Sequence, residues 1–326
     1  MKFQDLYHII NKSDYLKMEK IMNFLNYPEV EIARRNLDKE IELIWTGFRT
    51  CYSNKVNYAD MYPFKLDFST SELREKANSI IKDIKNFYVT ELCKTFNELT
   101  ELSEKFNYSV PGYIKHFTKE NLELFFDTEV SSLEKAISEG TVCLNEKAKE
   151  GYEFLRSILA CKWVYPKLRI GHGSPLEHGV ISFKVKNCSR SLTHQLVRHR
   201  VASYSQSSQR YISEDPDNLE FVIPKEIQDN KEALKIVEEY LENLSSSIKK
   251  LKELKVRNED IRCIYPNAIT TDIQVTMNFR ELRHFISLRL SKHAQDEIRK
   301  VAFDLLCYMC LRVPFVFADL TSSTEI

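Results

Sequence analysis

Cationic side chains gather in one stretch of a chain that carries no net charge. The 326 residues include 47 basic and 47 acidic side chains. Between Pro166 and Ile212, however, the only acidic residue is Glu177. The basic residues of this stretch are Lys167, Arg169, Lys184, Lys186, Arg190, Arg198, Arg200 and Arg210. Such a cluster in a neutral protein indicates a site for an anionic ligand.

The neighbours of these cations favour a nucleotide site over a solvated basic surface. Residues 189–211 read SRSLTHQLVRHRVASYSQSSQRY, a run rich in arginine, serine and glutamine. Arginine offers planar, bidentate donors to phosphate, whereas serine and glutamine can read a base edge or a flavin ring. Gln195 and Arg198 share a face if the helix continues, because they are three residues apart.

The elements that must position these residues belong to a mixed α and β class in which helices dominate. Alternating or β-branched runs predict strands at 179–185, 221–223 and 269–278. Helical spacing predicts helices at 69–106, 119–139, 146–162, 189–199, 231–254 and 280–310, the last with a break. An extended segment at 29–32 leads into a further helix through Ile44. Ser69 and Glu72 have the spacing of a capping box at the start of the first long helix.

Composition excludes several other classes of protein. Glycine is scarce, at 7 residues, and neither of the glycine-rich phosphate-binding motifs occurs. No apolar run approaches the roughly 20 residues of a membrane span. The N-terminus lacks the apolar core of a signal peptide, so we expect a cytoplasmic protein without a membrane partner. Balanced charge, with no interleaved aromatic platform, argues against nucleic acid.

The eight cysteines suggest neither disulfides nor a metal site. Cys307 and Cys310 form their one close pair, in the apolar run DLLCYMCLRV. No second pair of ligands is visible near them in the sequence, so we expect small buried core residues and no bound metal.

Five segments carry a resemblance to a known family. Arg198, His199 and Arg200, followed after seven residues by Ser208, form the pattern R-H-R-x7-S. This pattern resembles the signature of the flavin-dependent thymidylate synthases. Four more segments resemble family stretches, in the family's order: FRTCYS (48–53), GHGSPLEH (171–178), IRCIYPNA (261–268) and NFRELRHFISLRLSKHAQDEIR (278–299). The resemblance covers about 28–55 and 148–320.

The resemblance implies a fold, a reaction and an assembly. The fold would be α/β (α+β), with a central, mostly antiparallel or mixed sheet flanked by helices. The enzyme would methylate deoxyuridylate (dUMP) to thymidylate (dTMP). Its cofactor would be FAD reduced by NADPH or NADH, and 5,10-methylenetetrahydrofolate would donate the carbon. The family forms homotetramers whose active sites draw on more than one subunit.

Site residues follow from the resemblance by motif match. FAD would be held by Ser174, Arg198, His199, Arg200, Gln206, Asn278, Arg280 and His284. dUMP would be held by Gln195, Arg198, Gln206, Ser208, Arg210, Arg262 and Arg289. Arg289 would also polarise the uracil, and His172 would lie near flavin and folate, which makes these two the expected catalytic residues. Arginine keeps its charge at working pH, so Arg289 would act electrostatically on charge that develops on the ring.

No enzyme nucleophile is expected. None of the eight cysteines follows a proline, the setting of the nucleophile in ordinary thymidylate synthases. Ser208 lacks a G-x-S-x-G elbow. The alternative is a non-catalytic flavin- or nucleotide-binding relative, against which the presence of Gln195, Ser208, Arg262 and Arg289 argues. Whether His178, His194 and His293 are functional or core residues stays open at the level of sequence.

The resemblance also divides the chain. Residues 1–55 would form an N-terminal extension and the first part of a catalytic domain, and residues 148–326 its main part. Residues 56–147 would be a helical insertion. Its amphipathic helices hold none of the expected ligand-binding residues, so we interpret it as structural or interaction-forming.

Overall fold

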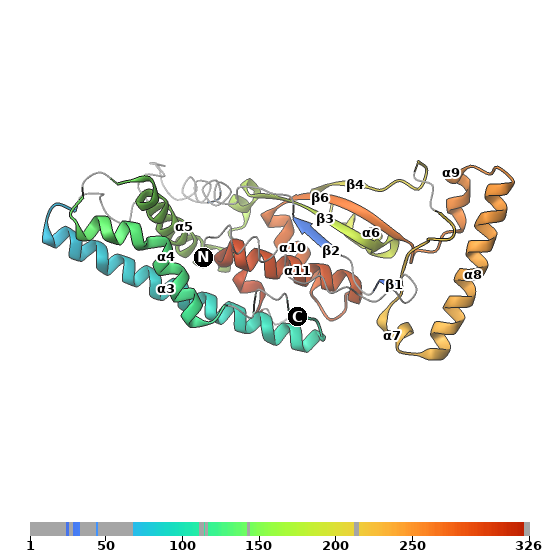
Figure 1. Cartoon of the computed structure of the whole chain (residues 1–326), viewed down its shortest axis with the longest axis horizontal. Helices are drawn as coiled ribbons and strands as arrows, with labels where there is room; N and C mark the ends of the chain where they lie inside the picture. The colour runs from blue at the N-terminus through green and yellow to red at the C-terminus, as the bar shows by residue number, and fades with distance from the viewer. Residues whose placement is uncertain are drawn as a thin grey trace. The chain divides into compact units, whose positions relative to one another are not determined.

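The computed structural model describes residues 24–25, 29–32, 44, 68–110, 114, 117–141, 144–211 and 215–322. These residues fall into two compact units (Figure 1). The described residues of the helical unit lie within Asn36–Gly179 and Leu306–Glu325, and those of the mixed unit within Lys17–Arg35 and Val180–Leu305. No helix in the described part of the chain is long and apolar enough to cross a membrane.

The mixed unit is built on a four-stranded antiparallel sheet. Its strands are β2 (Glu29–Ile32), β3 (Val180–Ser189), β6 (Thr270–Asn278) and β4 (Ala202–Gln206), in the order β2-β3-β6-β4. Every neighbouring pair is antiparallel, which confirms the predicted sheet type. The ends of these strands carry the R-H-R motif and Asn278.

The two faces of the sheet differ in polarity. Phe183 pairs with Val275, which pairs in turn with Tyr204, so these side chains share one face. The buried apolar residues of that face are Ile181, Phe183, Val185, Ile273, Val275 and Met277. The other face is polar, with hydrogen-bonded Ser182 and Thr276 directly opposite each other at 2.8 Å. The apolar face therefore holds the core, as alternation predicts for a sheet covered on one side.

Short helices on this core position the candidate site. α6 (Arg190–Leu196) contacts β3 and β6, and α10 (Phe279–Arg289) contacts β6. α10 buries Phe279, Leu282, Phe285 and Ile286, and the side chain of Asn278 caps its N-terminus. α11 (Asp296–Arg312) follows, so the predicted break falls between 289 and 296. Cys307 and Cys310 on α11 are fully buried, as expected.

An arm of the mixed unit has its own small core. It comprises β5 (Phe221–Val222), α7 (Lys225–Gln228), α8 (Lys231–Glu253), α9 (Asn258–Ile261) and the 3-10 turn η4 (Arg262–Ile264). β5 pairs in parallel with β1 (Phe24–Leu25). Phe221, Ile223, Leu244, Ile248, Ile261 and Ile269 form the buried cluster. Figure 1 shows α8, in orange, standing apart from the sheet. The arm places Arg262 at the start of η4.

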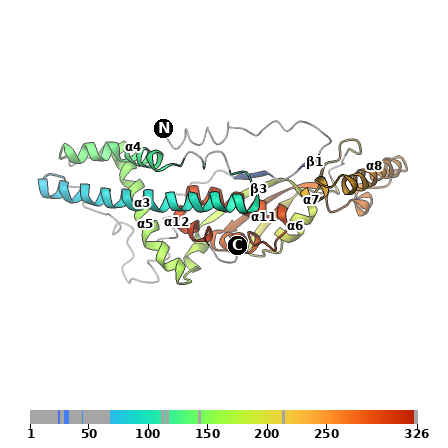
Figure 2. The ribbon, with the colours of Figure 1, turned by 90° about the horizontal axis from the view of Figure 1, so that it is seen from below.

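The helical unit is a bundle of long helices. α4 (Lys119–Ser138) runs back along α3 (Ser71–Phe106), and both pack against α5 (Glu146–Arg169) (Figure 2). Tyr88 and Phe126 each lie with their ring centroid 5.6 Å from that of Phe154, which ties the three helices together. η3 (Ser174–His178), α12 (Pro314–Phe317) and η5 (Ala318–Leu320) complete the unit.

Two sequence predictions for this unit need correction or extension. The N-cap of α3 is Thr70, whose hydroxyl accepts from the backbone N–H of Leu73, so the prediction that Ser69 caps this helix is wrong by one residue. α5 extends to Arg169, seven residues beyond the predicted end. Within the predicted N-terminal helix, only Ile44 lies among the described residues, where it is helical and buried.

Candidate active site

The R-H-R motif occupies the turn that links α6 to β4. α6 ends at Leu196, and the next residues turn before the strand begins at Ala202. Arg198 and Arg200 are exposed, whereas His199 between them is 4% exposed. The motif thus presents two cations to solvent and sends its imidazole into the core.

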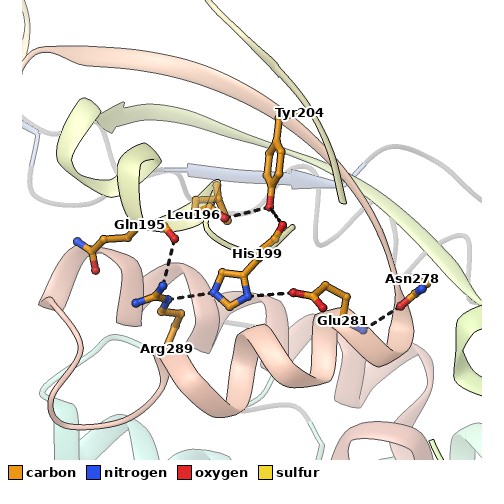
Figure 3. A network of polar contacts seen from close by, with 7 residues as sticks. All are labelled: Gln195, Leu196, His199, Tyr204, Asn278, Glu281 and Arg289. Atoms are coloured by element: carbon orange, nitrogen blue, oxygen red, sulfur yellow. Dashed lines mark hydrogen bonds and ion pairs between the residues drawn. The ribbon is translucent and has the colours of Figure 1, made fainter. Parts of the chain in front are cut away.

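The buried imidazole lies between a carboxylate and a guanidinium (Figure 3). His199 Nδ1 is 3.1 Å from Oε1 of Glu281. Nε of Arg289 donates to His199 Nε2 over 3.1 Å, and a terminal nitrogen of Arg289 donates to the carbonyl oxygen of Gln195, also over 3.1 Å. The ring of Phe285 contacts the imidazole edge-on, with centroids 5.0 Å apart. Glu281, Phe285 and Arg289 follow one another at four-residue intervals, so one face of α10 supplies all three contacts to the imidazole ring.

Tyr204 fixes the backbone on the other side of the turn. Its hydroxyl lies 2.9 Å from the carbonyl oxygen of Leu196 and 2.6 Å from that of His199 (Figure 3). Burial, with a smaller effect of the Glu281 charge, raises the pKa of Tyr204 to about 12. The hydroxyl therefore keeps its proton and remains a donor to the turn.

The electrostatics of this network keep His199 neutral. Burial lowers the pKa of His199, and the nearby Arg289 and His284 lower it further, while Glu281 opposes them. Burial and then the charge of Arg198 lower the pKa of Arg289, but arginine still stays protonated at working pH. The network therefore holds the half-buried cation of Arg289 against a neutral ring.

A second cluster joins the segment after β4 to the arm. Arg210 and Arg257 each donate to the carboxylate of Glu259, over 3.3 and 3.4 Å. Nε of Arg262 donates to the carbonyl oxygen of Glu259 over 3.2 Å. The hydroxyl of Ser208 accepts from the backbone N–H of Arg210 over 3.3 Å. Arg210 and Arg262, two of the residues expected to bind dUMP, thus both contact Glu259, and Ser208, a third, contacts Arg210.

The remaining predicted residues of the mixed unit have simpler surroundings. Nε2 of Gln206 donates to the hydroxyl of Thr193 over 3.0 Å, and Nε2 of Gln195 donates to Gln295 over 2.5 Å. Arg280 and His284 are exposed on α10, and the ring of His284 lies 5.6 Å from that of His199. The side chain of Asn278 is engaged as the N-cap of α10.

His172 and Ser174 belong to the helical unit. Both are exposed, Ser174 as the first residue of η3 and His172 in the turn before it. Their place at a flavin site stays a prediction.

His178, His194 and His293 are exposed, so the reading of these three as core histidines is wrong. His178 closes η3, His194 lies on the outer side of α6, and His293 lies in the loop between α10 and α11.

One group of side chains within the described residues has the spacing of metal ligands. Candidate ligand atoms of His199, Glu281 and His284 lie within 4.8 Å of one another. Both ring nitrogens of His199 are already engaged, one of them by Arg289. A metal cation would have to displace one of these two contacts and would lie close to the charge of Arg289, so this group is poorly suited to metal binding.

Comparison with known proteins identifies the family. The family model described as "Thymidylate synthase complementing protein" matches residues 118–314, more than half of the chain. The chain belongs to this family. The matched region of the thymidylate synthase complementing proteins includes the R-H-R turn, α10 and the arm. It begins at residue 118, before the boundary at 147 that the sequence resemblance suggested.

Individual relatives carry a more specific name. "Flavin-dependent thymidylate synthase" from Pyrococcus furiosus is 48% identical over 147 residues, which is 44% of this chain and 60% of that protein. The protein of the same name from Nitratidesulfovibrio vulgaris is 39% identical over 189 residues, 55% of this chain and 72% of that protein. The chain thus spans about three fifths of the length of the Pyrococcus relative.

A solved structure of ThyX from Helicobacter pylori with FAD and dUMP is a more distant likeness. It is 23% identical, covers 50% of this chain and 83% of its own, and has a TM-score of 0.40. So partial an overlap supports no detail of the fold or the site.

Sequence reasoning missed three residues of the site. Glu281 and Glu259 both lie in the first turn of a helix, where an acid is expected simply to complement the helix dipole. Glu281, Phe285 and Arg289 lie four residues apart, and this spacing was the signal that could have placed them on one face of α10. Tyr204 stands in a polar run that gave no strand signal.

Proposed function

We propose that this protein is a flavin-dependent thymidylate synthase that methylates dUMP to dTMP. The observation that carries the proposal is the half-buried guanidinium of Arg289, held between Nε2 of His199 and the carbonyl oxygen of Gln195 in a member of this family. A fixed cation beside a ligand pocket stabilises negative charge that develops during a reaction without needing to reorganise.

In this proposal Arg289 polarises the uracil ring. Reduction and methylation of the ring place negative charge on its carbonyl oxygen and nitrogen, and the guanidinium stabilises that charge. Two of its nitrogens are bound by His199 and Gln195 in the described structure, so its direction is set before a ligand arrives. Arginine cannot give up its proton at working pH, so Arg289 serves as an electrostatic group and not as a general acid.

The second cluster fits the phosphate of dUMP. Arg210 and Arg262 converge on Glu259, and Ser208 adds a hydroxyl. Paired guanidiniums suit phosphate because they donate in a bidentate way. Ser208 acts here as a binding group, since its hydroxyl accepts from the backbone N–H of Arg210 and, among the described residues, makes no hydrogen bond to a histidine that could serve as its base.

The exposed cations around the R-H-R turn fit FAD. Arg198, Arg200, Arg280 and His284 are all exposed donors on the turn and on α10, which suits a pyrophosphate-bearing cofactor. When bound, FAD would supply the hydride. We assign Gln206 and Asn278 to the same cofactor site, with Gln206 also reaching dUMP, and His172 and Ser174 to the flavin and folate side.

The same proposal includes the co-substrates, assembly and location. NADPH would reduce the flavin, and 5,10-methylenetetrahydrofolate would donate the carbon. The protein would work in the cytoplasm as a homotetramer, in which a site as long as FAD draws on more than one subunit. No observation favours the alternative of a non-catalytic flavin- or nucleotide-binding relative.

Purified protein tests the proposal directly. A yellow preparation with flavin absorbance is expected, and its reduced flavin should be reoxidised by the folate donor only when dUMP is present. The gene should also restore thymidine-free growth to a host that lacks thymidylate synthase. Flavin binding without any dUMP-dependent reoxidation would support the non-catalytic alternative instead.

A further inference from the structure

Glu281 forms the far end of the chain of contacts that holds Arg289. It lies in the first turn of α10, and its side chain is 12% exposed. No ligand role was expected for it. Its carboxylate is 3.1 Å from His199 Nδ1, on the opposite side of the ring from Arg289 (Figure 3).

The proton on His199 is fixed by elimination. A guanidinium only donates, so Nε2 of His199 must present its lone pair to Nε of Arg289. A neutral imidazole then carries its single proton on Nδ1, where the Glu281 carboxylate accepts it. Each contact requires the other, because the opposite tautomer would set two N–H groups of Arg289 and His199 against each other.

The surroundings hold all three groups in place. The backbone N–H of Glu281 donates to the side chain of Asn278 over 2.8 Å, so the carboxylate belongs to the capped first turn of α10. Phe285 packs edge-on against the imidazole, and the hydroxyl of Tyr204 holds the carbonyl oxygen of His199. Rotation of the ring would break several of these contacts at once.

We infer that Glu281 is a positioning residue for Arg289: its carboxylate fixes His199 as the Nδ1–H tautomer, and the ring in turn orients the guanidinium. This inference rests on the proposed function for the role of Arg289 in turnover. The hydrogen-bonded chain itself is independent of that function.

The consequence of losing the carboxylate follows from the same logic. With alanine at 281, the Nδ1–H of a buried ring has no acceptor, so the Nε2–H tautomer and other ring orientations become accessible. Arg289 then keeps only its contact to Gln195. With glutamine at 281, the amide oxygen can still accept from Nδ1–H, so the chain of contacts survives without the charge.

Proton NMR of the purified protein tests the hydrogen-bonded chain without any substrate. The wild type should show a far-downfield, slowly exchanging ring N–H signal, assigned to His199 by its loss in His199→Gln. Glu281→Ala should lose this signal and Glu281→Gln should keep it. The exposed acid Glu239 on α8 offers a matched loss of charge, and Glu239→Gln should leave the signal unchanged.

Kinetics and binding test the consequence for Arg289. Glu281→Ala should lower dTMP formation about 10- to 100-fold with flavin content unchanged, since a small misplacement of a catalytic group costs up to about 10²-fold. It should also weaken dUMP binding, measured by titration without NADPH or folate. Glu281→Gln should stay within about threefold of the wild type in both measurements, because the acceptor is retained.

The outcomes separate this inference from the proposed function. A signal that persists in Glu281→Ala, or wild-type dUMP binding and turnover in that variant, would overturn the inference. If the wild type forms no dTMP at all, the proposed function fails, and the NMR signal still decides whether Glu281 sets the state of His199.

Discussion

The carboxylate of Glu297 accepts two hydrogen bonds from Ser189, one from the backbone N–H over 2.7 Å and one from the hydroxyl over 2.5 Å. The same hydroxyl caps α6 by accepting from the backbone N–H of Leu192 over 3.0 Å. A buried acid at the start of α11 therefore sets where α6 begins, and α6 carries Gln195 toward Arg289.

Replacing this acid should destabilise the fold. Glu297→Ala leaves the buried N–H of Ser189 without an acceptor, and we expect a loss of about 1.5–3 kcal/mol in the free energy of unfolding, as for hydrogen bonds to charged groups. Glu297→Gln should lose less, because its amide oxygen can still accept. Urea unfolding measures both, and equal losses would contradict the role of the hydrogen bonds.

The stability of the protein should also respond to pH through Glu297. Burial raises the pKa of Glu297, although the bonds from Ser189 oppose the shift. Because the pKa of Glu297 is raised in the folded state, its contribution to the free energy of unfolding is fully present below its pKa in the unfolded chain, about 4.3. The contribution is lost as the pH rises through the folded pKa. The free energy of unfolding of Glu297→Gln should be flatter over that window, and profiles parallel to the wild type would contradict the assignment.

Removing the cation of Arg289 should abolish most turnover. Arg289→Ala should keep FAD but form dTMP more slowly by about 10²-fold or more, the usual effect of removing a preorganised charge donor. Single-turnover measurements at saturating dUMP isolate this effect from binding. Near-normal turnover would remove Arg289 from the catalytic role.

The acid in the second cluster should compete with the phosphate of dUMP. Glu259 holds Arg210 through an exposed ion pair, and such pairs are worth about 0.2–1 kcal/mol. Freeing the guanidinium in Glu259→Gln should therefore lower the KM for dUMP by up to about fivefold, with little change in kcat. Glu242→Gln on α8 removes an equal charge from the exposed side of the arm and should have no effect. A KM that rises in Glu259→Gln would show that Glu259 supports the site.

The packing of α3, α4 and α5 should be separable from flavin binding. Phe126 on α4 is fully buried against Tyr88 and Phe154, so Phe126→Ala should destabilise this unit by about 3–5 kcal/mol. Leu124 on the same helix is 66% exposed, and Leu124→Ala is the matched control. We expect flavin content to be unchanged in both variants at temperatures where they remain folded. Loss of FAD from folded Phe126→Ala would place this helical bundle within the cofactor site.

The elements that sequence could predict are those with a strong period. The sequence predicts β3 and β6 because their apolar residues recur at every second position, and it predicts α8 because its apolar residues recur every three to four positions. β4 was missed because it is an edge strand, in which Ser203 and Ser205 face solvent and leave no apolar alternation. The order of the strands depends on pairings across about 90 residues, which no local pattern encodes.

The sequence could predict which residues belong to the candidate site, but not how they contact one another. Arg210 and Arg262 were assigned to one ligand by motif, and the structure does bring them together at Glu259. His199 was expected to line the cofactor site, yet it is buried and bonded to Arg289. The role of Glu281 arises only when α10 packs on the R-H-R turn, so the sequence of α10 alone could not show it.

Formation of dTMP by the purified protein tests the central claim most directly. The protein should be incubated with dUMP, 5,10-methylenetetrahydrofolate and NADPH, with FAD in excess. The nucleotides should then be separated and their masses measured by mass spectrometry. We predict a product heavier than dUMP by one methylene group, formed in proportion to enzyme and about 10²-fold or more slowly with Arg289→Ala. A wild-type protein that binds FAD and dUMP but leaves dUMP unchanged would contradict the proposed activity.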